Sequence, residues 1–145
     1  MKLVIFAGGF GTRLSEETIN IPKPLVKIGD MPIIWHIMKY YSSFGVKDFI
    51  ICLGYKGYEI KDFFINYKKF NKLISINLKS NKITSTEELE DWNVNLIDTG
   101  LNTQTAGRLK KVYEYIKNED FFFLTYGDGL SDVNINTLKD FHLKN

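Results

Sequence analysis

The chain has 145 residues, the length of one ordinary domain, and its 44% hydrophobic and 25% charged residues place it in the globular class. Nineteen basic and 17 acidic residues leave a formal charge of +2, and no dense Lys/Arg block favours nucleic acid or an anionic membrane as a partner. Cys52 is the single cysteine and cannot close an internal disulfide, and no apolar run approaches the roughly 18 residues that span a bilayer. We therefore expect a cytoplasmic protein.

The first half of the sequence alternates short apolar runs with helical stripes. Residues 3–7 are all apolar and end at a glycine pair, which is typical of a central parallel strand buried on both faces. After a glycine-bearing loop, Pro32 precedes apolar residues at helical spacing, and this stripe ends near Gly45. Residues 49–53 and the stripe over 60–67 repeat the pattern, so we predict two successive strand–helix units.

In the second half of the sequence, the spacing of the apolar residues changes first to strict alternation. Residues 74–86 alternate apolar and polar side chains around a tight turn at Asn81, which predicts an inserted β-hairpin. Three further elements follow: a strand over 92–98, a helix over 109–116 and a buried strand over 121–124. A last helix begins after Asp132 or Asn134 and has no glycine cap, so we expect a truncated chain.

The order of these elements defines the fold class. Strands that alternate with helices predict an α/β fold with a mostly parallel sheet, because right-handed crossovers place helices on both faces of such a sheet. We assign residues 1–145 to one domain of this kind. Ligands of these sheets bind beyond the carboxyl ends of the strands.

A glycine-rich motif follows the first strand. Residues 8–13 read Gly-Gly-Phe-Gly-Thr-Arg, and Pro-Lys-Pro follows at 22–24. Glycines let backbone N–H groups surround an anion, and Arg13 and Lys23 add positive charge, so the motif indicates phosphate binding. It lacks the Gly-Lys-Ser/Thr ending of a Walker loop, and Leu14 stands where the dinucleotide fingerprint needs a small residue. The alternative is a glycine turn with solvated cations.

Two weaker motifs lie further along the chain. Asp128 stands between two glycines at the end of an apolar strand, where its carboxylate could hold a Mg²⁺ that carries a nucleoside triphosphate, or could simply form a turn. Residues 105–108 read Thr-Ala-Gly-Arg at the start of a predicted helix, where the helix N-terminus favours an anion. The alternative for residues 105–108 is a glycine in the first turn of the helix and an exposed Arg108, without any ligand, and the sequence fits this equally well.

Together these motifs resemble those of the sugar nucleotidyltransferases. Residues 6–14 with Pro-Lys-Pro at 22–24 are similar to the signature loop of that family. Phe6 stands where leucine is usual, and Ala106 where glycine is common. A closer resemblance, to members that use CTP and glucose 1-phosphate, is carried by residues 34–39, 51–58, 96–100, 107–110 and 125–129. The resemblance covers the chain from Met1 to about its end and implies a Rossmann-like, doubly wound nucleotide-diphospho-sugar transferase fold.

The resemblance also implies roles for individual residues. Arg13 and Lys23 would act in catalysis on the phosphates, and Asp128 would bind Mg²⁺. The nucleotide site would consist of Ala7, Gly8, Gly9, Gly11, Thr12, Arg13, Lys23, Thr105, Gly107 and Arg108.

The implied reaction joins CTP and a sugar 1-phosphate into a CDP-sugar and releases pyrophosphate, with Mg²⁺ as cofactor. Family members are longer, and their additional part carries a second carboxylate for the metal and most of the sugar-phosphate pocket. We expect a homo-oligomer. Two alternatives stay open: a nucleotidyltransferase of another base or acceptor, and a nucleotide-binding fragment without turnover.

Overall fold

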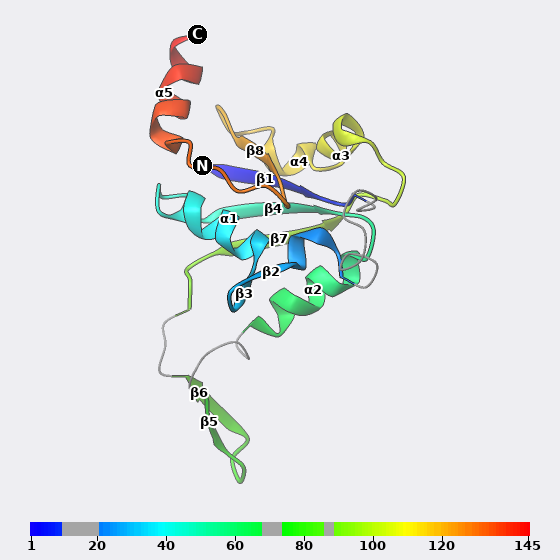
Figure 1. Ribbon diagram of the computed structural model, residues 1–145, viewed down its shortest axis with the longest axis vertical. Coiled ribbons are helices and arrows are strands. Elements are labelled where there is room, and N and C mark those ends of the chain that lie inside the picture. The colour runs from blue at the N-terminus through cyan, green and yellow to red at the C-terminus, as the bar shows by residue number, and fades with distance from the viewer. Residues whose placement is uncertain (10–20, 68–73, 86–88) are drawn as a thin grey trace.

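The computed structural model describes residues 1–9, 21–67, 74–85 and 89–145. Its central sheet consists of four parallel strands in the order β7-β4-β1-β8 (Figure 1). Leu3 pairs with Phe49 on one side and with Phe123 on the other, so β1 is an interior strand of this sheet. The strands are β1 (Lys2–Ala7), β4 (Asp48–Leu53), β7 (Asn93–Asp98) and β8 (Phe123–Tyr126).

Helices cover both faces of the sheet, which confirms the doubly wound α/β fold. On one face, alternate residues of β1 and β4 pack against α1 (Ile33–Ser42), α2 (Gly57–Ile65) and the start of α5 (Ile135–Lys144). On the other face, the remaining residues of these strands pack against Val112 and Ile116. Every residue of β1 from Leu3 onward is buried, as the apolar run predicts.

The helix predicted over residues 109–116 differs from the prediction. It begins four residues earlier, as α3 (Thr105–Lys111), and a break at Val112 separates it from α4 (Tyr113–Ile116). Val112 has φ −101° and ψ 7°, outside helical geometry, and its side chain is fully buried against the sheet. The four residues 105–108 thus form the first turn of α3, as their place at the start of the predicted helix implies.

The strand predicted over residues 121–124 also differs. β8 begins at Phe123, two residues later, and of its side chains only that of Phe123 is buried. Leu124 and Tyr126 are 45% and 58% exposed. The prediction of a buried strand over residues 121–124 is therefore wrong for this element, which within the described residues has β1 as its single neighbour.

The segment before α1 contains a short 3-10 helix, η2 (Lys23–Leu25), and a small antiparallel pair, β2 (Lys27–Ile28) and β3 (Met31–Pro32). Pro24 is buried beneath the loop after β8: a Cβ atom at Gly127 would lie 3.1 Å from Pro24 Cγ. This packing fixes Lys23 beside that loop.

The predicted hairpin is present as β5 (Ile74–Asn77) and β6 (Lys82–Ser85), and it projects away from the sheet (Figure 1). Ile76 and Ile83 form a cross-strand pair and are 54% and 61% exposed. Among the described helices, none is both long enough and apolar enough to cross a membrane.

Candidate functional site

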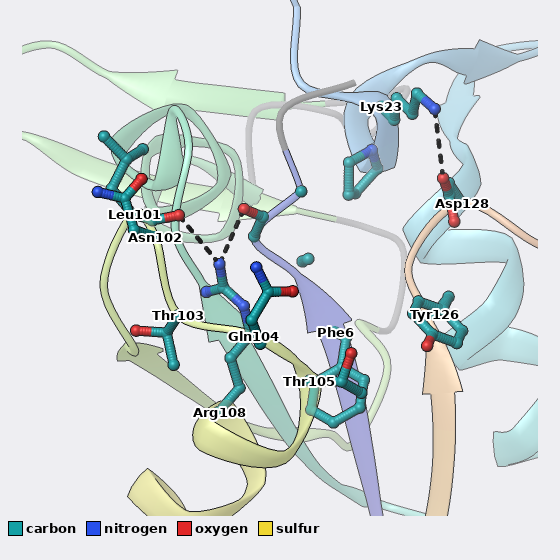
Figure 2. A pocket seen from close by; sticks show the side chains of 14 residues that line it. Phe6, Lys23, Leu101, Asn102, Thr103, Gln104, Thr105, Arg108, Tyr126 and Asp128 are labelled. Carbon is teal, nitrogen blue, oxygen red and sulfur yellow. Dashed lines mark hydrogen bonds and ion pairs between the residues drawn. The ribbon is translucent and has the colours of Figure 1, made fainter. Parts of the chain in front are cut away.

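A pocket of about 320 Å³ lies at the carboxyl end of β1, where ligands of parallel sheets bind (Figure 2). Four segments line it: residues 6–9, η2, the stretch from Leu101 to Arg108, and the end of β8 with its loop. Of the residues predicted for the site, seven line this pocket: Ala7, Gly8, Gly9, Lys23, Thr105, Arg108 and Asp128. Gly11, Thr12 and Arg13 lie outside the described residues.

Lys23 and Asp128 face each other at one side of the pocket (Figure 2). Lys23 Nζ lies 3.9 Å from Asp128 Oδ2, and the two side chains are 19% and 44% exposed. Exposed ion pairs stabilise a fold by only about 0–1 kcal/mol. Both charges can therefore turn to a ligand at little cost to the fold.

The two glycines after β1 differ in their surroundings. Among the described residues, a Cβ atom at Gly9 would have no neighbour within 4 Å, so this part of the chain leaves the backbone open to the pocket. A Cβ atom at Gly8 would lie 2.1 Å from Arg108 Nη1. Gly8 therefore leaves room for the arginine, whereas Gly9 leaves room for a ligand.

Arg108 is buried, with 6% of the residue exposed, so the alternative of an exposed arginine is wrong. Its Nη1 donates hydrogen bonds to the carbonyl oxygen of Leu53 at 2.9 Å and to Thr99 Oγ1 at 2.6 Å. Its Nη2 donates to the carbonyl oxygens of Gly8 at 3.0 Å and Leu101 at 3.4 Å (Figure 2). We call Arg108 and these four acceptors the strand-end network.

Sequence reasoning missed two residues of this region. Thr99 is fully buried, and its Oγ1 accepts from Arg108 while donating to the carbonyl oxygen of Leu53 at 2.7 Å. A Cβ atom at Gly54 would lie 2.8 Å from both Arg108 Nη1 and the Gly8 carbonyl oxygen. The signal for Gly54 was its place directly after β4; nothing in the sequence pointed to the hydroxyl of Thr99.

Gly107 does not line the pocket, although its neighbours Thr105 and Arg108 do. A Cβ atom at this position would lie 2.8 Å from Thr103 Cγ2. The glycine therefore allows the loop after β7 to pack closely on the first turn of α3, which is a sufficient structural reason for it.

Metal-binding groups are sparse in the part of the chain that the structure describes. No three His, Cys, Asp or Glu side chains gather there into a group that could hold a metal ion. Within the pocket lining, Asp128 supplies the carboxylate.

Comparison with known proteins agrees with this geometry. A family model described as nucleotidyl transferase matches residues 2–145. Glucose-1-phosphate cytidylyltransferase of Salmonella typhimurium is 54% identical over 143 residues, which cover 98% of this chain and 56% of that protein. Mannose-1-phosphate guanyltransferase of Saccharomyces cerevisiae is 31% identical over 143 residues, covering 98% of this chain and 34% of that protein. The chain thus spans about half the length, or less, of these curated relatives.

A solved structure shows the same fold. HddC from Yersinia pseudotuberculosis, complexed with GMP-PN, matches with a TM-score of 0.72 and 28% identity over 98% of this chain and 54% of that one. The parallel sheet, the pocket at its carboxyl edge and the match over nearly all residues lead to one conclusion: the chain belongs to the nucleotidyl transferase family.

Proposed function

We propose that the protein transfers a cytidylyl group from CTP to a sugar 1-phosphate, with glucose 1-phosphate as the first candidate, to give a CDP-sugar and pyrophosphate. The observation that carries this proposal is the pocket in which Lys23, Asp128 and the open backbone at Gly9 lie together. The 54% identity to a glucose-1-phosphate cytidylyltransferase supports the choice of base and sugar.

The chemistry requires no protein nucleophile. A phosphate oxygen of the sugar 1-phosphate attacks the α-phosphorus of CTP, the bond from that phosphorus to the pyrophosphate oxygen breaks, and pyrophosphate leaves with the electron pair. Such transfers depend on positioning and on neutralisation of phosphate charge. Lys23 supplies positive charge at the pocket, and the lack of a side chain at Gly9 lets the backbone approach the phosphates.

The residues present fit a Mg²⁺ ion that arrives on the nucleotide. Mg²⁺ is usually held by one or two carboxylates together with substrate phosphates, so one protein carboxylate at this point is a suitable donor set. Asp128 lines the pocket with 44% of its side chain exposed, and its contact with Lys23 is long. When bound, the ion would neutralise phosphate charge; Asp128 would hold it there, and Lys23 would hold the phosphates.

A second candidate is transfer of another nucleotide. The HddC structure contains GMP-PN, and the Saccharomyces relative is named a guanyltransferase, which favours guanine as the competing base. A nucleotide-binding chain without turnover is the third possibility. The cytoplasm stays our proposed compartment, because the reaction consumes a nucleoside triphosphate. A homo-oligomer stays a prediction.

The base assignment is tested by isothermal titration calorimetry. With Mg²⁺ present, we expect the chain to bind CTP more tightly than ATP, GTP or NAD, because the cytidylyltransferase-like segments accompany the phosphate pocket. Equal affinity for all four compounds would contradict the base assignment. A preference for GTP would instead support the second candidate.

The phosphate contact is tested by Lys23→Ala. We expect this change to weaken triphosphate binding by about 1.5–3 kcal/mol, the value of a charge-assisted hydrogen bond, while the melting temperature stays close to that of the parent chain. Lys27→Ala is the matched control, because Lys27 is exposed on β2 and does not line the pocket. Arg13→Ala should behave like Lys23→Ala. Unchanged affinity in both would show that these cations are merely solvated.

The metal role is tested by Asp128→Asn, which keeps the shape of the side chain and removes its charge. We expect the variant to lose most of the gain in CTP affinity that Mg²⁺ gives the parent chain, with little change in binding measured in excess chelator. Asp132→Asn is the control, since Asp132 is exposed and lies outside the pocket lining. A parent-like response to Mg²⁺ in the Asp128 variant would remove this residue from the metal site.

A further inference from the structure

We propose that His36 and Tyr40 are positioning residues, which hold from one face of α1 the two exposed segments that carry Lys23 and Asp128. This inference rests on the proposed function, because it concerns the placement of the two charges that would contact phosphate and metal. Neither His36 nor Tyr40 lines the pocket, so each would act through the segment that it holds.

Helix α1 is a firm support for both segments. Its residues Ile34, Ile37 and Met38 are almost completely buried in the core beside the sheet. His36 and Tyr40 lie four residues apart, so their side chains leave the helix on the same face, one turn from each other. Each of them makes a hydrogen bond to the backbone of a different segment.

The first segment leads from Lys23 to α1 and is held by His36. Residues 27–30 of this segment are exposed, so apolar packing does not fix them. His36 Nε2 lies 2.9 Å from the carbonyl oxygen of Ile28. A carbonyl oxygen can only accept, so Nε2 carries the proton and donates it. This bond attaches the exposed β2–β3 turn to α1.

Backbone hydrogen bonds connect the same segment to Lys23. The N–H of Ile33, the first residue of α1, donates to the carbonyl oxygen of Val26 at 2.8 Å. The N–H of Val26 donates in turn to the carbonyl oxygen of Lys23 at 3.0 Å. Val26 directly joins η2 to β2. A shift of β2 away from α1 would therefore move Val26 and, with it, the backbone of Lys23.

The second segment is the loop between β8 and α5, which carries Asp128 near its start. Residues 128–134 are all exposed, and a cavity of about 250 Å³ lies between the loop and α1. The hydroxyl of Tyr40 donates to the carbonyl oxygen of Val133 at 3.0 Å. Within the part of the chain that the structure describes, this is the one hydrogen bond that reaches residues 128–133 from outside the loop.

Lys23 and Asp128 meet where the two segments come closest. Pro24 lies beneath Gly127 at this point, and the two charges are 3.9 Å apart. An ion pair this long and this exposed adds little stability, so it does not fix the two charges by itself. The packing of Pro24 holds the inner ends of the two segments, and α1 holds their outer ends.

The role of His36 is tested by calorimetry with inorganic tripolyphosphate, at a temperature where circular dichroism shows each variant folded. His36→Leu removes the donor, whereas His36→Gln keeps an N–H group. We expect His36→Leu to weaken binding by about 2- to 10-fold, as loss of one hydrogen bond predicts, and His36→Gln to restore most of it. His142→Leu is the matched control, because His142 is exposed on α5 and lies outside the pocket lining.

Repeating His36→Leu in the Lys23→Ala chain separates positioning of Lys23 from a general structural effect. If His36 acts through Lys23, the second change should cost little further affinity, because the two residues act as one unit. An equal loss in both backgrounds, or parent-like binding by His36→Leu, would overturn the role of His36.

Tyr40→Phe tests the other arm, because it removes only the hydroxyl. We expect the gain in CTP affinity that Mg²⁺ gives the parent chain to fall by about 2- to 10-fold, while tripolyphosphate binding without Mg²⁺ stays unchanged. The same change in the Asp128→Asn chain should have little further effect. Tyr113→Phe is the control, since Tyr113 is exposed on α4. A parent-like response to Mg²⁺ in Tyr40→Phe would overturn the role of Tyr40.

Hydrogen exchange of the ligand-free protein keeps this test separate from the proposed function. The Val26 N–H, which donates to the Lys23 carbonyl oxygen, should exchange faster in His36→Leu than in the parent chain, while the amides of β4 keep their rates. Unchanged exchange at Val26 would overturn this proposal alone. A parent chain that binds neither CTP nor tripolyphosphate would overturn the proposed function and this proposal together.

Discussion

The hydrogen bonds of the buried Arg108 guanidinium are the interactions on which the pocket depends. Parallel strands end in carbonyl groups that lack a partner, and a buried carbonyl left without a donor costs about 1–3 kcal/mol. Arg108 supplies donors to the backbone after β1, at the end of β4 and in the loop after β7. The glycines at 8 and 54 follow from its presence, and two of the residues to which it donates, Gly8 and Leu101, line the pocket.

The charged residues of the pocket differ in how far they are exposed to solvent. Lys23 and Asp128 are partly exposed and form a long ion pair. Breaking this pair to bind a ligand would cost the fold little stability. Arg108 is almost fully buried, and its guanidinium donates to the carbonyl oxygens of Leu53 and Gly8 and to the hydroxyl of Thr99. The partly exposed pair is therefore suited to contact phosphate and metal.

Much of the fold could be predicted from sequence, because the buried strands β1 and β4 are apolar at every position from the second onward. β8 was predicted two residues too early because Phe121 and Phe122 extend the apolar run, whereas the strand itself exposes Leu124 and Tyr126. The glycines after β1, Lys23 and Asp128 were found from motifs. The burial of Arg108 could not be predicted, because two of its partners are main-chain oxygens 55 and 100 residues away, and no local pattern encodes such contacts.

A crystal structure of this chain with CTP and Mg²⁺ is the most direct test of this account. We predict that the triphosphate lies at the Gly9 backbone with Lys23 on its oxygens and Asp128 on the metal. A structure in which CTP occupies another part of the chain would contradict it.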